Sequence, residues 1–397
     1  MHATIIGAGI AGLALAKGLR AVGFDVEVFE QAPELKPLGA GIALTANGLR
    51  ALRALGLYEA VIKRGEEIRR ISVLDERGHV LETTDHLRLS ERFGHMSAVA
   101  LHRSALHEAL RSSIPRDIVH TGKRCTAARQ CANDVQVLFE DGQDRRTDLL
   151  LACDGIHSAV RRSLYPEWRE RFAGYTCWRG VVPGEVESGH MTESWGGGRR
   201  FGIVPLKDGQ VYWFACTGSG VAGDRALETV GLPQLRELFT GFHQSVREVL
   251  SAPPAGELIW NDIFDVPPRH AYTQGRVVLL GDAAHAVTPD LGQGASQALE
   301  DAAVLPTLLA RYPLTAALAC FDSQRRPRTR RLVRDSRRFA RIAQFSHPVA
   351  VRLRNTLVRK LPARVNERWI DSILDVHFDP VHLPHVRHPE RPRQRMA

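Results

Sequence analysis

Cysteine is scarce in this sequence, with six residues in a chain of 397, and no two of them form a C-x-x-C pair. Zinc sites and the disulfide frameworks of small secreted domains both need closely spaced cysteines, so neither is expected. No apolar stretch approaches the roughly 20 residues that a membrane-spanning helix needs. The apolar start, residues 5–16, follows no basic residue of the kind that opens a signal peptide. We therefore expect a cytoplasmic protein without a metal site.

Charge is distributed unevenly along the chain. The formal net charge is +9, yet residues 325–397 alone hold nineteen Lys and Arg against six Asp and Glu. The preceding part of the chain is therefore mildly acidic, and the C-terminal segment is strongly basic. The segment matches no nucleic-acid-binding motif, so we expect no nucleic-acid partner.

A glycine-rich turn near the start is the most informative motif. Gly7, Gly9 and Gly12 lie between an apolar strand, residues 3–6, and a run that favours a helix, residues 10–22. Glycines at this spacing let the backbone approach a pyrophosphate, and the helix N-terminus attracts its negative charge. Glu30 ends the next predicted strand, residues 25–29, near the roughly 20-residue spacing at which a carboxylate binds an adenosine ribose. The pattern predicts a dinucleotide site.

Two later motifs predict where the rest of that ligand lies. The continuous apolar run at 277–280 is typical of a buried parallel strand, and it delivers Asp282 at its carboxyl end. Open α/β sheets bind ligands at that end, where a carboxylate can accept hydrogen bonds from a polyol. A second glycine turn, residues 289–294, opens a predicted helix at 295–310, whose N-terminal amides would face the same ligand.

Together with the pair Asp154-Gly155, these motifs resemble those of the single-component FAD-dependent aromatic monooxygenases with the p-hydroxybenzoate hydroxylase fold, over nearly the whole chain. The resemblance implies that FAD is bound without a covalent link and that NADH or NADPH binds transiently near the Asp-Gly pair. The residues that it places at the cofactor are Gly7, Gly9, Ala11, Gly12, Glu30, Gln31, Gly41, Arg103, Asp154, Gly155, Arg161, Gly281, Asp282, Pro289, Gly292, Gln293, Gly294 and Ala295.

The resemblance also implies a reaction. Such an enzyme uses NAD(P)H and inserts one atom of O2 into a small aromatic or heteroaromatic ring through a flavin C4a-hydroperoxide, a species that survives only where water is excluded. Two alternatives stay open. One is an epoxidase of an isoprenoid or polyketide, and the other is a flavin oxidase or flavin-binding regulator that inserts no oxygen.

Short alternating strands occupy the sequence between the flavin motifs. Patterns of period two predict a hairpin at 70–83 and an antiparallel sheet over 176–216 that turns at Asp208-Gly209. The predicted fold class is α/β, with a Rossmann-like FAD-binding domain, an inserted antiparallel β-sheet substrate domain and a C-terminal helical segment. The expected parts are residues 1–70, 96–170 and 269–325 for FAD, residues 71–95 and 171–268 for the substrate, and residues 326–397 for the basic helical segment and tail.

Three polar residues are predicted to be catalytic. Arg200 and Tyr212 lie on neighbouring predicted strands, and Asp290 lies in the loop beside the flavin. Asp290 would take a proton from the ring, Arg200 would hold the resulting anionic oxygen, and Tyr212 would orient it. A surface ion pair and a tyrosine at a sheet edge are the alternative, because alternation alone does not show which face a residue occupies.

Two subfamilies resemble this chain most. The region of Arg200, Tyr212 and Asp290 is similar to FAD-dependent urate hydroxylases, which implies a polar heterocyclic substrate. The overall likeness is greater to 2-alkyl-4-quinolone 3-monooxygenases, but their pattern carries asparagine where this chain has Asp290.

The C-terminal segment also allows two interpretations. Arginine pairs punctuate a predicted helix after residue 325, and residues 349–361 mix apolar and basic positions. Such a stretch either packs on the core as a surface helix or contacts an anionic membrane surface. His382, His385 and His388 follow, but prolines interrupt any helix that would align them, so a loosely ordered tail is favoured over a metal site.

Overall fold

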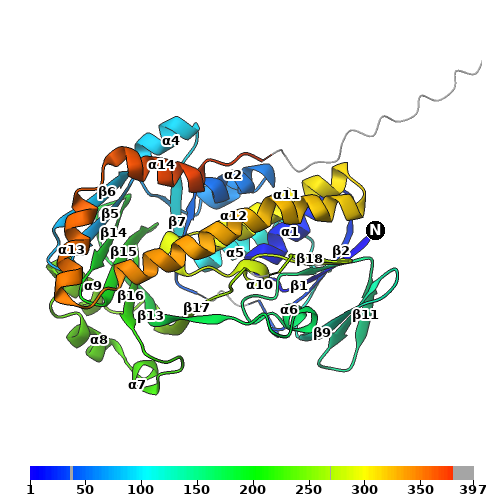
Figure 1. The fold of residues 1–397 in the computed structure, drawn as a ribbon, viewed down its shortest axis with the longest axis horizontal. Coiled ribbons are helices and arrows are strands. Elements are labelled where there is room, and N and C mark those ends of the chain that lie inside the picture. The colour runs from blue at the N-terminus through cyan, green and yellow to red at the C-terminus, as the bar shows by residue number, and fades with distance from the viewer. Residues whose placement is uncertain (36–38, 269, 379–397) are drawn as a thin grey trace, which may run out of the picture.

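The computed structural model describes residues 1–35, 39–268 and 270–378 (Figure 1), so His382, His385 and His388 lie outside the described residues. One half of the molecule is built on a six-stranded sheet in the order β18-β19-β12-β1-β2-β8, which we call the Rossmann sheet. Its strands are β1 (His2–Ile6), β2 (Asp25–Phe29), β8 (Val119–His120), β12 (Leu149–Ala152), β18 (Thr273–Gln274) and β19 (Val277–Leu279). β1 pairs in parallel with β2 and β12, and β12 with β19. Segments far apart in the sequence therefore end at one edge of this sheet.

Apolar side chains bury the Rossmann sheet on both faces. Every residue of β12 and β19 is 0% exposed, as expected of parallel strands covered by helices. The helices of this half are α1 (Ile10–Ala21), α2 (Ala46–Ala54), α3 (Tyr58–Ile62), α5 (Arg103–Arg111), α6 (Ala159–Leu164) and α11 (Gly294–Arg311). α1 and α11 approach closely at Gly18, where an added Cβ would lie 2.8 Å from Cγ of Pro306.

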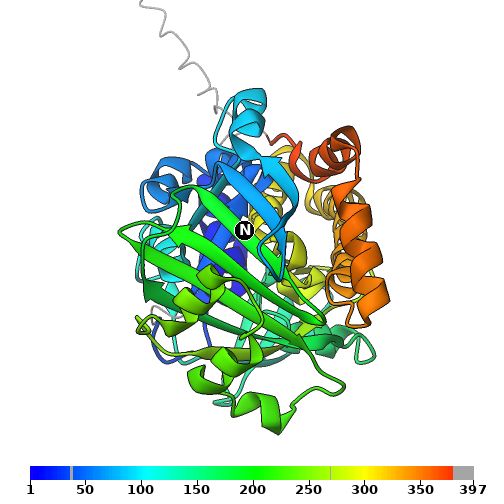
Figure 2. The same cartoon turned by 90° about the vertical axis from the view of Figure 1, so that its left-hand side faces the viewer.

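The other half is a seven-stranded sheet in the order β17-β13-β16-β15-β14-β5-β6, which we call the large sheet (Figure 2). Its strands are β5 (Arg70–Asp75), β6 (Val80–Asp85), β13 (Arg171–Pro183), β14 (His190–Trp195), β15 (Arg199–Leu206), β16 (Gln210–Gly218) and β17 (Ile259–Asp265). β15 and β16 form the predicted hairpin, which Asp208 and Gly209 turn with φ angles of 60° and 67°. The β5-β6 hairpin joins the sheet because β5 pairs in parallel with β14.

The two faces of the large sheet differ in composition. On the outer face Trp178, Phe201 and Trp213 belong to an apolar cluster with α8 (Leu232–Leu238) and α9 (Gln244–Ser251). Side chains two residues apart on a strand share a face. The opposite, inner face therefore carries Arg200 and Tyr212, and it lies against the Rossmann half.

Several smaller elements lie outside the two large sheets. They are β3 (Gly41–Thr45), β4 (Glu66–Glu67), β7 (Ala98–His102), β9 (Cys125–Gln130), β10 (Val135–Phe139), β11 (Asp144–Thr147), α4 (His86–Phe93) and α7 (Arg225–Glu228).

Three helices follow at the C-terminal end: α12 (Leu314–Ala343), α13 (Pro348–Arg359) and α14 (Ala363–Leu374). α12 runs from the Rossmann half to the large sheet (Figure 1). Its Arg337 pairs with Asp265 of β17 at 3.2 Å, so α12 packs on the body of the protein. Among the described helices, none combines the length and the apolar character needed to cross a membrane.

Candidate active site

In the first glycine turn, Gly7 and Gly12 are tightly packed, whereas Gly9 faces open space. Gly7 has a φ of +100°, and a Cβ there would lie 2.3 Å from the carbonyl oxygen of Cys153. A Cβ at Gly12 would lie 1.9 Å from the Gly7 oxygen, whereas one at Gly9 meets nothing within 4 Å. Gly7 and Gly12 are therefore required for packing, and Gly9 faces the space into which a pyrophosphate fits.

Glu30 follows β2 and braces this turn. Its Oε2 accepts a hydrogen bond from the Ala8 amide at 2.8 Å, and its Oε1 accepts one from the Ala32 amide at 2.9 Å. A carboxylate has about four acceptor positions, so two remain for ribose hydroxyls. Gln31, beside it, is exposed and accepts a hydrogen bond from Arg124 at 2.6 Å. Glu30 thus has the position that the sequence predicted, with a second function in holding the turn.

The Gly-Asp motif lies where β19 ends. Asp282 opens the short helix α10 (Asp282–His285) and is exposed, and its side chain forms no hydrogen bond within the described part of the chain. Burial of the surrounding region raises the pKa of Asp282, while His285 and Arg103 lower it. The motif approaches the first turn, because a Cβ at Gly281 would lie 3.1 Å from that of Ala11. The carboxylate is available to a polyol beside the pyrophosphate site.

The third motif is the pair Asp154-Gly155, which follows β12. Asp154 accepts a hydrogen bond from the Val160 amide at 3.2 Å, and its Oδ1 is buried without a hydrogen-bond partner in the described structure. Gly155 has a φ of +75° and open space where a Cβ would stand. Arg161, in contrast, is 0% exposed and donates to the carbonyl oxygens of Trp168 and Ala283. Arg161 therefore positions the Asp282 loop and is not exposed to a ligand.

The second glycine turn is held from inside the protein. Pro289 opens the 3-10 helix η1 (Pro289–Leu291), and Gly292 has a φ of +61°. The Gln293 side chain is buried, and its Oε1 accepts a hydrogen bond from Asn47 at 2.8 Å. Gly294 and Ala295 then begin α11, so their amides are among the unpaired donors of a helix N-terminus.

Below this turn lies a buried network of charged side chains that fixes α11. Arg325 of α12 pairs with Glu300 and, at 2.7 Å, with Asp301, and all three residues are at most 2% exposed. His285 contacts Asp301 at 2.7 Å. Burial alone would raise the pKa of Asp301, but His285 and Arg325 outweigh it and hold that pKa at about 2. The network ties α10, α11 and α12 together behind the cofactor motifs.

A polar cluster lies where the large sheet meets the second glycine turn. Arg200 Nη2 lies 2.6 Å from Asp290 Oδ1, and Arg200 Nη1 lies 3.0 Å from Glu193 Oε1. Tyr175 donates its hydroxyl to Asp290 Oδ2 at 2.7 Å. Burial would lower the pKa of Arg200, but Asp290 and Glu193 outweigh it and raise that pKa well above its usual value. Arg200 therefore stays charged.

Two atoms of this cluster lack hydrogen-bond partners. Within the described structure, Arg200 Nε and Asp290 Oδ1 are buried and make no hydrogen bond, although Asp290 Oδ1 has an ion-pair contact with Arg200 Nη2 at 2.6 Å. Unsatisfied buried polar atoms are costly and require an explanation. Arg200 Nε thus keeps an unused donor, and Asp290 Oδ1 can accept a hydrogen bond in addition to its ion pair.

Tyr212 lies on the same sheet face but farther along. Arg200 is opposite Cys216 in the hairpin, whereas Tyr212 is opposite Val204, four residues away on each strand. The Tyr212 ring packs on Gly41, where a Cβ would lie 2.3 Å from it. The structure therefore unites Arg200 with Asp290 and separates both from Tyr212.

Sequence reasoning missed Tyr175, Glu193 and Arg179. Arg179 is half-buried on the inner face and forms no ion pair with a described carboxylate. Burial raises the pKa of Tyr212, and the charge of Arg179 partly opposes that shift. Tyr175 could have been found from its period-two spacing with Cys177 and Arg179, but nothing local marks its contact with Asp290.

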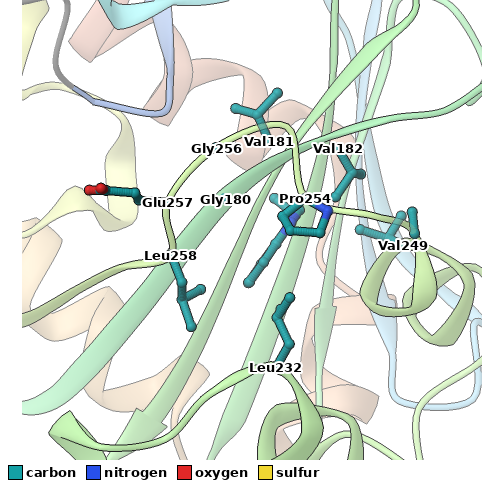
Figure 3. Close-up of a pocket in the computed structure, with 11 residues that line it drawn as sticks. Gly180, Val181, Val182, Leu232, Val249, Pro254, Gly256, Glu257 and Leu258 are labelled. Atoms are coloured by element: carbon teal, nitrogen blue, oxygen red, sulfur yellow. The ribbon is translucent and has the colours of Figure 1, made fainter.

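The outer face offers a pocket of different character (Figure 3). It has a volume of about 110 Å³ and is lined mainly by apolar groups, among them Val182, Leu232, Val249 and Leu258. It lies across the sheet from Arg200 and Asp290, so we place the chemistry on the inner face.

Comparison with known proteins agrees with this geometry. A family model described as "FAD binding domain" matches residues 1–336. Aurachin C monooxygenase/isomerase from Stigmatella aurantiaca is 36% identical over 92% of this chain and 95% of its own. The 2-heptyl-3-hydroxy-4(1H)-quinolone synthase of Pseudomonas aeruginosa is 35% identical over 91% of this chain and 94% of its own. Klebsiella pneumoniae HpxO, solved with FAD and uric acid, superposes with a TM-score of 0.86 at 32% identity, covering 94% of this chain and 97% of that one.

These matches confirm the predicted fold class, the enzyme class and the cofactor. The open space at Gly9, the exposed Asp282 and the half-buried Glu30 are the groups that would hold FAD. The chain belongs to the FAD-dependent aromatic monooxygenases with the p-hydroxybenzoate hydroxylase fold.

Proposed function

We propose that this protein uses NADH or NADPH to reduce its bound FAD and inserts one oxygen atom of O2 into an aromatic or heteroaromatic ring. Bound FAD supplies the hydride acceptor and the activation of O2, and the protein supplies orientation, proton transfer and a dry site. The names of the relatives support a small ring substrate, since they include a quinolone synthase and a urate hydroxylase.

The observation that carries the proposal is the pair of unsatisfied atoms at Arg200 Nε and Asp290 Oδ1. A ring with an N–H or O–H next to an oxygen would satisfy both, because it donates to the carboxylate and accepts from the guanidinium. Tyr175 holds the other carboxylate oxygen in place. The preferred substrate is therefore a ring with adjacent donor and acceptor groups.

Proton transfer follows from the same contacts. When Asp290 takes the ring proton, its negative charge moves to the substrate oxygen, and Arg200 loses an ionised partner at Nη2. The guanidinium can then pair with the new oxyanion, which stabilises the electron-rich ring that attacks an electrophilic oxygen. The catalytic role of Asp290 and Arg200 is part of the proposal, and Tyr212 is proposed to contact the far end of the substrate.

The test is product formation by Asp290→Asn and Arg200→Ala with FAD bound, using labelled oxygen gas and a panel of hydroxyquinolines, hydroxybenzoates and purines. We expect turnover to fall roughly 10²-fold or more, with FAD retained and label found in the remaining product. Turnover of Tyr175→Phe should fall less, because the variant loses one hydrogen bond to Asp290 but keeps both Asp290 and Arg200. Val221→Ser on the outer surface is the matched control. Wild-type rates in both charge variants, or product without label, would contradict the proposal.

A further inference from the structure

The C-terminal helix α13 exposes a row of large apolar side chains. Val349, Leu353 and Leu357 are 66%, 59% and 61% exposed, and Leu361 directly after the helix is 45% exposed. Residues at intervals of four lie on one face of a helix. More than half of the large apolar side chains that the described structure leaves exposed lie between residues 342 and 365. The row is therefore a concentrated feature of this segment.

The side of α13 that faces the protein is firmly held and partly polar. Arg354 is 3% exposed, donates to the carbonyl oxygen of Ala343 at 2.7 Å, and stacks over the Trp195 ring at 5.3 Å. Val358 packs against the cluster of Leu81 and Trp195. The helix thus buries an arginine and exposes leucines. A helix that faces only water does the opposite, since it buries its apolar side chains and exposes its charged ones.

Charge on this segment has one sign. Residues 336–365 contain eight Lys and Arg and no Asp or Glu. Arg352 and Lys360 are exposed on α13 and at its end, and neither forms an ion pair with a described residue. In Figures 1 and 2 α13 lies at the outer edge of the molecule, beside the large sheet. Apolar and basic side chains are therefore presented together at one edge.

We propose that α13, with Leu361, is a docking face for an anionic phospholipid membrane. The leucines would enter the boundary between headgroups and acyl chains, and Arg352 and Lys360 would contact the phosphates. This occupant fits because basic side chains rim an apolar row, whereas a second copy of the chain would bring the same positive charge against itself. Docking would place the large sheet at the lipid surface, and it does not depend on the proposed reaction.

The experiment is flotation of the full FAD-loaded protein with phosphatidylcholine vesicles, prepared with and without phosphatidylglycerol, at low and high salt. Leu353→Ser with Leu357→Ser removes the apolar row, and Arg352→Gln with Lys360→Gln removes the charges. Val221→Ser is the matched control, since Val221 is 62% exposed and lies outside α13, in the loop after β16. All four positions are on the surface, and bound FAD and the melting temperature check that each variant is folded.

We expect binding to phosphatidylglycerol vesicles at low salt that weakens at high salt. Loss of the two charges should weaken it by about 25-fold, at roughly fivefold for each basic residue, and loss of the two leucines by about tenfold or more. The control should bind as the wild type does. Absence of lipid binding, or binding that neither double variant reduces, would overturn the proposal. So would dimers in sedimentation velocity that the leucine variant abolishes while lipid binding is absent.

Discussion

Replacing Gly9 by alanine should weaken FAD binding while leaving the free energy of unfolding nearly unchanged. Gly9 is the N-cap of α1 with φ −76° and ψ −170°, a conformation that alanine adopts readily, and an added Cβ meets nothing within 4 Å. Less freedom in the unfolded chain would stabilise the variant by about 0.4–1 kcal/mol, and the poorer N-cap would cost a similar amount. The free energy of unfolding of the FAD-free protein should therefore change by no more than about 0.5 kcal/mol.

FAD affinity should respond very differently. The new methyl group would stand between the helix N-terminus and the pyrophosphate, so at least one hydrogen bond to a charged oxygen is lost. Such a bond contributes about 1.5–3 kcal/mol, which weakens FAD binding roughly 10- to 150-fold.

Gly7→Ala is the matched comparison on the same turn. Its φ of +100° is unfavourable for alanine, and its Cβ would lie 2.3 Å from the Cys153 oxygen. The conformational cost of about 1–2 kcal/mol and the overpacking cost of about 1–3 kcal/mol together should lower the free energy of unfolding by roughly 2–5 kcal/mol.

Urea unfolding of the FAD-free proteins, followed by circular dichroism, measures stability, and quenching of flavin fluorescence measures FAD affinity. The reasoning is refuted if Gly9→Ala unfolds as easily as Gly7→Ala, or if Gly9→Ala binds FAD as tightly as the wild type.

Three further predictions concern the carboxylates behind and beside the cofactor. Asp282→Ala should weaken FAD binding roughly 10- to 150-fold in the same titration, with urea unfolding of the FAD-free protein unchanged. Arg325→Met should lower the free energy of unfolding by about 3–5 kcal/mol, because the buried Glu300 and Asp301 lose the cation that they share and keep only Arg328 and His285; an unchanged urea midpoint would contradict this. The pKa of Asp301 is lowered from 3.8 to about 2, so its ionised form stabilises the fold by about 2 kcal/mol above pH 4, and that contribution is lost as the pH falls through about 2. Acid unfolding of Asp301→Asn should lack this part of the pH dependence.

Local patterns in the sequence predicted much of the fold. The strand at Asp25–Phe29 has the predicted bounds, and the turn at Asp208-Gly209 joins the predicted strands. Both depend on residues close in sequence: alternating apolar side chains in the strand, and two residues that tolerate positive φ in the turn. The glycine turn was predictable for the same reason, since strand, turn, helix and acid follow within 30 residues.

Contacts between distant segments were not predictable in this way. Tyr175, and not Tyr212, contacts Asp290, because the register of β13 and β16 and the position of η1 decide which tyrosine reaches that loop. The burial of Arg161 could likewise not be predicted, because its partners Trp168 and Ala283 lie far apart in the sequence and only the folded chain brings them together. The domain boundaries stay predictions, as do the cofactor and catalytic roles of individual residues.

The two faces of the large sheet can change in sequence independently of each other. Trp178, Phe201 and Trp213 form a core with α8 and α9 on one side, and Arg200 and Tyr212 alternate with them on the other. Under the proposed function, stability and ligand recognition are thus encoded at interleaved positions of the same strands. Substitutions at every second residue can change the ligand while the core that carries the strands keeps its composition, which makes the sheet a natural target for directed evolution.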